Sequence, residues 1–271
     1  MGHRLPPDGV AAPLPQGRPA DARLGRADLV RARKTSAASY NLLALARTPE
    51  ELSAANVTSS TVESIGTFVG PALGGILLAL VGFGAKAGLL PLHVWLPEAH
   101  PAAPSPVSAL MSAVMLKTAI YGLLRVSFDL LSYPVWWWGV AALVIGLLTA
   151  LYGVMFAAVQ TDMKRLLAYS SIENIGVIVA GLGLALVFRA YGNPHLAALA
   201  LVATLYHCLN HACFKSLLFL GTGSVLHATH ERSLGKLGGL IRTMPWVAAL
   251  TLVGALAIAG LPPLNGFVSE W

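Results

Sequence analysis

Seven ionisable side chains lie within stretches of this sequence that are otherwise apolar enough to cross a membrane. Placing such a group in hydrocarbon costs several kcal/mol, about 2.5–3.5 kcal/mol on insertion scales. A chain that keeps a series of them is most simply interpreted as moving charge, in particular protons, along a polar path. The residues that this pattern selects are Lys86, Lys117, Glu173, His207, His211, Lys215 and Glu270.

Three of these residues form a regular series. His207, His211 and Lys215 are spaced four apart, so in a helix they lie on one face, one turn apart. Because an imidazole titrates near neutral pH and a desolvated lysine approaches that range, the series is typical of a proton relay. The alternative is interhelical hydrogen bonding together with a lysine that extends to the membrane surface.

The two remaining lysines differ in their depth. Lys117 lies well inside an apolar stretch, between Val114-Met-Leu116 and Thr118-Ala-Ile120, and is too deep to extend to the surface easily. Lys86 lies nearer the end of its apolar stretch, so extension to the surface remains an alternative there.

The two glutamates also have competing explanations. Glu173 follows Ser170-Ser171 near the start of an apolar stretch, where it could begin a helix or pair with Lys164 or Arg165. Glu270 follows a proline-broken helix. Such breaks are tolerated in membranes where they line a wet cavity, because the freed backbone groups need partners.

Other polar side chains favour structural roles. His93, Glu98 and His100 are expected to cap and orient a proline-rich connection, with metal binding as the lesser alternative. Cys208 and Cys213 are five apart and face different sides of a helix, so we expect no mutual disulfide and no metal site. The chain has no GxGxxG or Walker loop and no cysteine set for an iron–sulfur cluster, so we predict no cofactor.

Composition predicts the fold class. Of the 271 residues, 56% are hydrophobic and 11% are charged, against about 25% charged in a soluble domain. Apolar runs of roughly 20 residues recur, the length needed to cross hydrocarbon. We predict an all-α polytopic transmembrane bundle with a disordered N-terminal tail. The net charge of +6 comes largely from that tail, so no nucleic-acid partner is expected.

Six spans are expected, at least one of them broken. They are 65–90, 107–131, 136–159, 166–188, 196–226, and a sixth that begins at Pro245 and is interrupted at 260–266. The first connection, 91–106, is rich in proline and should be mostly loop with at most a short turn. Three connections, 91–106, 161–165 and 227–244, fall on one side and carry more Lys and Arg, so that side should be cytoplasmic.

Five motifs resemble the antiporter-like membrane subunits of respiratory complex I, Mrp-type cation/proton antiporters and energy-converting [NiFe] hydrogenases. Glu173-Asn174, in Ser-Ser-Ile-Glu-Asn, is most similar to the hydrogenase-4 and formate hydrogenlyase branch. Residues from about 45 to 80 resemble a major facilitator fragment. The five motifs are Lys86–Leu110, Met115–Arg125, Asp162–Gly176, His211–Phe219 and Gly260–Glu270.

The resemblance implies a function and site roles. The chain would be a proton-translocating subunit without a redox centre of its own, in a complex I-like NADH:quinone oxidoreductase or a membrane-bound hydrogenase. Lys86 would serve the uptake path, Lys117 would link it to the central relay of His207, His211 and Lys215, and Glu270 would serve release. The implied partners are other membrane subunits, a peripheral redox arm and the lipid bilayer of the inner or cell membrane.

The domain organisation expected is a disordered basic tail at 1–35, an amphipathic helix with the first half of a span at 36–81, and the antiporter-like domain at 82–271, cut short at its C-terminus. The glutamate that the family pairs with its first lysine has no match here. Two alternatives therefore remain, a non-functional chimeric fragment with a junction near Leu80–Gly84 and a component of an Mrp-type antiporter.

Overall fold

The computed structural model describes residues 49–130 and 135–270. Within these ranges the chain forms helices and no strand, as the predicted all-α class requires. The predicted disordered tail, 1–35, lies outside the described residues. The chain divides into two units, Met1–Ala72 and Leu73–Trp271, and the arrangement described below is that of the second unit.

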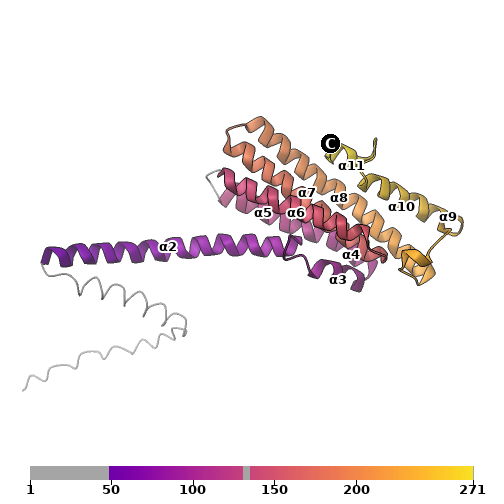
Figure 1. Cartoon of the computed structure of the whole chain (residues 1–271), viewed down its shortest axis with the longest axis horizontal. Helices are drawn as coiled ribbons and strands as arrows, with labels where there is room; N and C mark the ends of the chain where they lie inside the picture. Colours follow the sequence, from indigo (N-terminus) through magenta and orange to yellow (C-terminus); the bar gives the residue numbers. More distant parts are fainter. Residues whose placement is uncertain (1–48, 131–134, 271) are drawn as a thin grey trace, which may run out of the picture. The chain divides into compact units, whose positions relative to one another are not determined.

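The described residues contain ten α-helices and three shorter helical turns, joined by short connections (Figure 1). Two π-helical turns, η1 (Met111–Met115) and η2 (Val126–Leu130), join α4 to α5 and extend α5, and η3 (Leu234–Lys236) is a 3₁₀ turn. The α-helices are α2 (Pro49–Ala87), α3 (Trp95–Ala102), α4 (Ser105–Leu110), α5 (Leu116–Arg125), α6 (Trp136–Ala158), α7 (Met163–Ala190), α8 (Pro194–Thr229), α9 (Leu240–Thr243), α10 (Pro245–Ile258) and α11 (Asn265–Glu270).

Four helices are long and apolar enough to cross a membrane, and they coincide with four of the expected spans. Leu77–Ala87 and Pro245–Ile258 are shorter apolar helices, so the described residues hold fewer full-length spans than the six expected. The break expected in the last span is confirmed, because α10 ends at Ile258 and α11 begins at Asn265. The four long spans are Ser105–Leu130, Trp136–Ala158, Met163–Ala190 and Pro194–Thr229.

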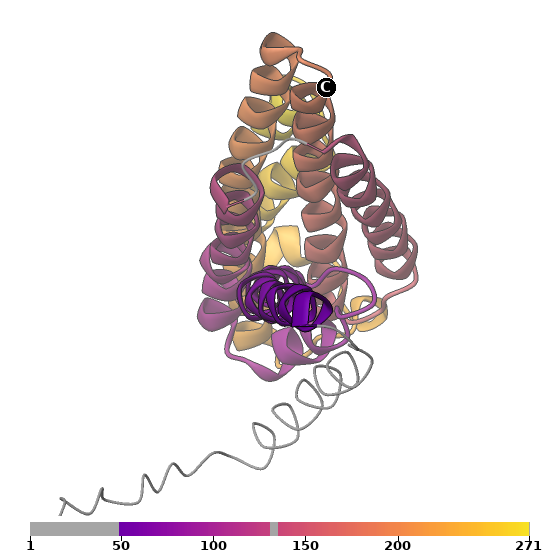
Figure 2. The ribbon, with the colours of Figure 1, turned by 90° about the vertical axis from the view of Figure 1, so that its left-hand side faces the viewer.

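Helix α7 is the central element of the bundle. It lies between α6 and α8 (Figure 2), and its side chains Ile172, Ile175 and Ile178 are fully buried. The helix begins at Met163 and is capped by Asp162, whose carboxylate accepts hydrogen bonds from the backbone N–H groups of Lys164 and Arg165 at 2.8 and 3.1 Å. Any group carried on the α8-facing side of α7 is therefore shielded from lipid.

Helices α6 and α7 pack through glycines. A Cβ atom added at Gly146 would lie 2.5 Å from the backbone nitrogen of Ala180 and 2.7 Å from the carbonyl oxygen of Gly176. Gly139, seven residues earlier on α6, makes the same kind of approach to α7. Small residues at such positions allow backbones to approach closely in membranes, where packing rather than hydrophobicity joins helices.

The expectation that 91–106 would be mostly loop is wrong, because α3 forms an eight-residue helix there. Pro97 lies in its first turn, where a helix needs no N–H donor. Pro101 lies in its last turn, and the helix ends as the N–H of Ala103 donates to Ala99 O. The indole N–H of Trp95 donates to Ala85 O at 2.8 Å, so tertiary contacts fix a segment whose prolines alone suggest a loop.

The three connections expected on one side of the membrane, 91–106, 161–165 and 227–244, contact one another at one end of the bundle. The N–H of Leu234, after α8, donates to Thr161 O, between α6 and α7, at 2.8 Å. Arg165, in the first turn of α7, forms an ion pair with Glu98 on α3 at 2.8 Å. This grouping at one end of the bundle confirms the predicted alternation of the spans.

The close approach of Gly146 to α7 predicts that a larger side chain at this position would force α6 and α7 apart. In Gly146→Leu the new side chain has no space against α7, so we expect the free energy of unfolding to fall by about 1–3 kcal/mol or more. The matched control is Gly82→Leu, because a Cβ atom at Gly82 meets nothing within 4 Å. Thermal unfolding in detergent compares the two variants, and equal unfolding temperatures would contradict the proposed packing role.

Candidate functional site

Lys117, on α5, directs its amine into the bundle. The π-helical turn η1 makes the N–H of Leu116 donate to Met111 O, so Ser112 O is left without its α-helical donor. The Lys117 amine donates to that oxygen at 2.7 Å. The same amine contacts Nδ1 of His211 on α8. A π turn at a functional position is a recurrent feature of helices, and here it supplies an acceptor for a buried amine.

His207 and His211 continue the contact along α8. Their ring centroids are 6.4 Å apart, and both side chains are buried. Nε2 of His207 lies 3.1 Å from Asn174 Oδ1 on α7, and its Nδ1 lies 3.0 Å from the Ser269 hydroxyl on α11. The broken helix therefore supplies a direct partner to the relay that the sequence predicted.

Lys215 is the most enclosed charged residue of this series, with 0% of its surface exposed. Its amine donates to Leu167 O at 2.9 Å and to the Ser170 hydroxyl. The carbonyl of Ser170 accepts from the Asn174 side-chain amide at 2.8 Å. Lys215 is thus linked through α7 to the same asparagine that binds His207.

We call this series the polar chain. Hydrogen bonds join its successive members, except that His211 and His207 are one helical turn apart and Nε2 of His211 has no hydrogen-bond partner among the described residues. Its first contact joins α5 to α8, two later contacts join α8 to α7, and the remaining two lie within α8 and within α7. It is shielded by α11 at Ser269 and by the packing of α7 against its neighbours. The polar chain consists of Lys117, His211, His207, Asn174, Ser170 and Lys215.

Glu173 lies beside the polar chain rather than in it. It is half-buried, and its carboxyl group interacts electrostatically with Lys215. The alternative that it begins a helix or pairs with Lys164 or Arg165 is not found: Asp162 caps the helix, and both basic side chains bond elsewhere.

Besides Glu173, two further predicted site residues are not brought into the polar chain. Lys86, in the last turn of α2, and Glu270, on α11, are exposed. Neither makes a hydrogen bond or ion pair with another described residue, although the charge of Glu173 acts on Glu270. Their roles in proton movement stay predictions.

The sequence analysis missed the small polar residues that serve as acceptors. Ser112, Ser170 and Asn174 contact the ionisable groups directly, and Ser112 and Ser171 also join η1 to α7 through their hydroxyls at 2.9 Å. The available signal was the presence of serine and asparagine inside otherwise apolar helices, where such side chains bond between helices.

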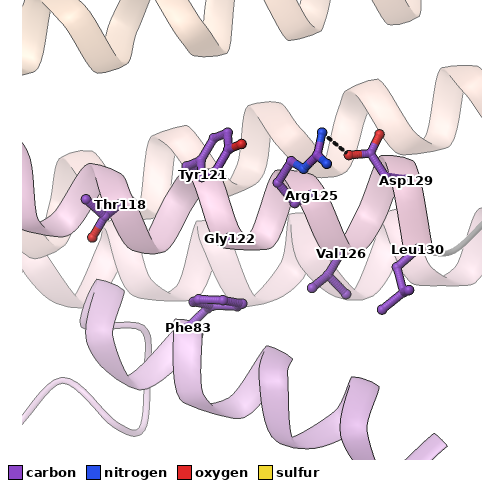
Figure 3. Close-up of a pocket in the computed structure, with 8 residues that line it drawn as sticks. All are labelled: Phe83, Thr118, Tyr121, Gly122, Arg125, Val126, Asp129 and Leu130. Carbon is purple, nitrogen blue, oxygen red and sulfur yellow. Dashed lines mark ion pairs between the residues drawn. The ribbon is translucent and has the colours of Figure 1, made fainter. Parts of the chain in front are cut away.

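A separate pocket lies on the outer side of α5 (Figure 3). Arg125 and Asp129 form an ion pair at 2.6 Å along its wall, and the Phe83 ring lies against Gly122. Its lining shares no residue with the polar chain. Among the described residues no three His, Cys, Asp or Glu side chains are grouped to hold a metal, and Cys208 and Cys213 are free, as expected from their spacing.

The family model described as "NADH:quinone oxidoreductase/Mrp antiporter, TM" matches residues 50–271. This match begins before residue 82, where the sequence analysis sets the start of the antiporter-like domain, and that boundary stays a prediction. A chain in the structure of the membrane-bound sulfane sulfur reductase, an archaeal respiratory membrane complex, superposes with a TM-score of 0.62 and 25% identity, covering 90% of this chain and 54% of that chain.

Curated relatives match 72% of this chain. Hydrogenase-4 component B of Escherichia coli (strain K12) is 52% identical and matched over 29% of its length, and formate hydrogenlyase subunit 3 of the same organism is 49% identical over 32% of its length. A component of the Na(+)/H(+) antiporter of Bacillus subtilis (strain 168) is 39% identical over 24% of its length. The chain therefore spans less than a third of the length of these relatives.

The burial of Lys215 predicts an unusual response to substitution. Lys215→Met keeps most of the side-chain volume and removes an amine that is costly to desolvate, so we expect unfolding at an unchanged or higher temperature. Lys215→Ala leaves a cavity, and we expect its free energy of unfolding to fall by about 2–5 kcal/mol. Thermal unfolding in detergent measures both variants. A Met variant as unstable as the Ala variant would show that the amine itself stabilises the fold.

Proposed function

Because this chain belongs to the NADH:quinone oxidoreductase/Mrp antiporter transmembrane family, we propose that it conducts protons within a membrane complex. It acts as a membrane subunit, or part of one, of a complex I-like NADH:quinone oxidoreductase or a membrane-bound [NiFe] hydrogenase. Electron transfer takes place in partner subunits, and this chain carries no redox centre.

The polar chain is the observation that carries this proposal. Two amines and two imidazoles lie in series at the centre of an apolar bundle, and each has a neighbour within hydrogen-bonding distance or one helical turn. Charged groups in a membrane interior are costly and mark ion pathways and proton relays. A purely structural network would be served by neutral hydroxyl and amide groups at less cost.

The mechanism is a series of proton transfers coupled by charge. A proton that reaches Lys117 passes to Nδ1 of His211, and the positive charge thus created favours release from the next group, Lys215. Like charges at close range disfavour simultaneous protonation of neighbouring sites, so the arrival of one proton promotes the departure of another. Glu173 balances the charge at Lys215, and Glu270 receives the proton on the release side.

Partner subunits couple electron transfer to proton movement in this chain. A peripheral redox arm and further membrane subunits change the field at Lys86, which is exposed and open to a neighbouring subunit. The inner or cell membrane is the location, with the connections around α3 and η3 on the cytoplasmic side, because they carry the larger share of Lys and Arg.

The second candidate is an Mrp-type sodium/proton antiporter subunit, which the family description and an antiporter relative favour. The higher identity to hydrogenase-4 and formate hydrogenlyase subunits, together with Glu173-Asn174, supports the hydrogenase branch instead. Dependence of the proton flux on a sodium gradient distinguishes the two candidates.

Removing the Lys117 amine should stop conduction without unfolding the chain. We expect Lys117→Ala to lower the proton flux by about 100-fold, since positioned proton-transfer groups contribute about 10²–10⁴-fold to rates. The measurement uses the purified chain in liposomes with an enclosed pH-sensitive dye and an imposed potassium diffusion potential.

The matched control is Lys236→Ala, because Lys236 is exposed outside the bundle and, within 49–130 and 135–270, forms its ion pair with Glu231. This variant should conduct as the unaltered chain does. Equal fluxes from the Lys117 and Lys236 variants, with the unaltered chain conducting, would overturn the proposed role of the polar chain.

A further inference from the structure

His100, on α3, is a buried histidine whose ring is bound to nothing polar. Its side chain is 0% exposed, and neither ring nitrogen has a hydrogen-bond partner among the described residues. The ring stacks on Phe219 of α8, with centroids 4.8 Å apart and planes inclined by 20°. Buried polar atoms are nearly always paired, so an unpaired imidazole calls for an explanation.

A capping role does not explain this ring. The sequence analysis expected His100 to cap and orient its connection, but only its backbone carbonyl does so, by accepting from the Ser108 hydroxyl at 2.9 Å. Any residue would supply that carbonyl. The imidazole therefore contributes nothing to the connection beyond its volume, and an apolar ring would fill the same space without the cost of desolvating two nitrogens.

Two buried amines influence the ring electrostatically. Lys215, one helical turn before Phe219 on α8, and Lys164, on α7, both act on it electrostatically. Lys164 is 2% exposed and donates to Ala103 O, just beyond α3, at 2.7 Å. Burial, together with the charges of Lys215 and Lys164, lowers the pKa of His100 to about 4. A neutral imidazole carries one N–H donor and one acceptor nitrogen, as a proton relay requires.

A polar pocket lies against α3 and the start of α7. It has a volume of about 460 Å³, which is room for several water molecules at about 30 Å³ each. Two ion pairs of partly exposed side chains border it, Arg165 with Glu98 and Arg232 with Asp162. Its lining residues are Glu98, Pro101, Ala102, Asp162, Arg165 and Arg232.

We propose that His100 is a proton-transfer residue that joins Lys215 to this pocket, giving the polar chain an opening on the side where the connections meet. The inference rests on the proposed function, because it adds a branch to the same path. Pro101 and Ala102, the two residues that follow His100 on α3, line the pocket, and the ring stacks on Phe219, one helical turn from Lys215.

The transfer is balanced in protons. A hydronium ion in the pocket gives a proton to the acceptor nitrogen of His100, and the opposite nitrogen releases its proton toward the neutral amine of Lys215. A flip of the ring then turns the newly protonated nitrogen toward Lys215 and the free acceptor nitrogen toward the pocket, and no other reactant is consumed. Burial and the positive charge of Lys164 make the imidazolium short-lived, so the ring passes protons on rather than storing them.

The test compares His100→Gln with His100→Phe in the liposome assay. Glutamine keeps a similar size and can hydrogen-bond but cannot take up a proton, and phenylalanine keeps the stacking on Phe219. We expect both variants to lower the proton flux by about tenfold or more and to unfold at a temperature no lower than that of the unaltered chain. The matched control is His227→Gln, at an exposed histidine near the end of α8, and its flux should be unchanged.

The outcomes separate the two proposals. If the unaltered chain conducts, Lys117→Ala does not, and both His100 variants conduct fully, the His100 branch is overturned while the proposed function stands. Full flux in the glutamine variant alone would assign the ring a hydrogen-bonding role and also overturn the branch. If the unaltered chain itself conducts no protons, the proposed function fails first.

Discussion

The structure depends on finding acceptors for amines that lie in the middle of an apolar bundle. A lysine amine has three donors and no acceptor, and leaving it unpaired in such surroundings costs more than most folds can lose. Lys117 and Lys215 meet this constraint differently. One uses a carbonyl oxygen released by a π turn together with an imidazole, and the other uses a carbonyl and a hydroxyl of α7.

The same constraint accounts for the arrangement of the helices. Helix α7 must lie against α8 closely enough for Ser170 and Asn174 to reach Lys215 and His207, and the glycines shared with α6 hold its other face. The broken segment between α10 and α11 brings Ser269 to His207 and lets Asn265 O accept from Asn210. Packing and proton chemistry are therefore supported by one set of contacts.

Helical periodicity in the sequence correctly predicted which residues of α8 share a buried face. The spacing of His207, His211 and Lys215 placed them on one face, and all three are buried. Proline rules failed at α3, because contacts from Arg165 and Lys164, far along the chain, reach that helix at Glu98 and just beyond its end at Ala103. Lys86 and Glu270 were predicted to lie in the path, but their surroundings depend on whatever packs against them, which local sequence does not encode. Serine and asparagine inside apolar helices indicated acceptors, but their partners could not be predicted, since a π turn or a serine hydroxyl becomes an acceptor for lysine only when the fold brings the amine to it.

Proton conduction by the chain itself is the central claim, and it is tested most directly by the unaltered protein in sodium-free liposomes under an imposed membrane potential. The account predicts acidification of the lumen, reported by an enclosed pH dye, well above that of protein-free vesicles and in proportion to the protein added. A rate equal to that of protein-free vesicles, from protein that retains its helical content, would contradict the account.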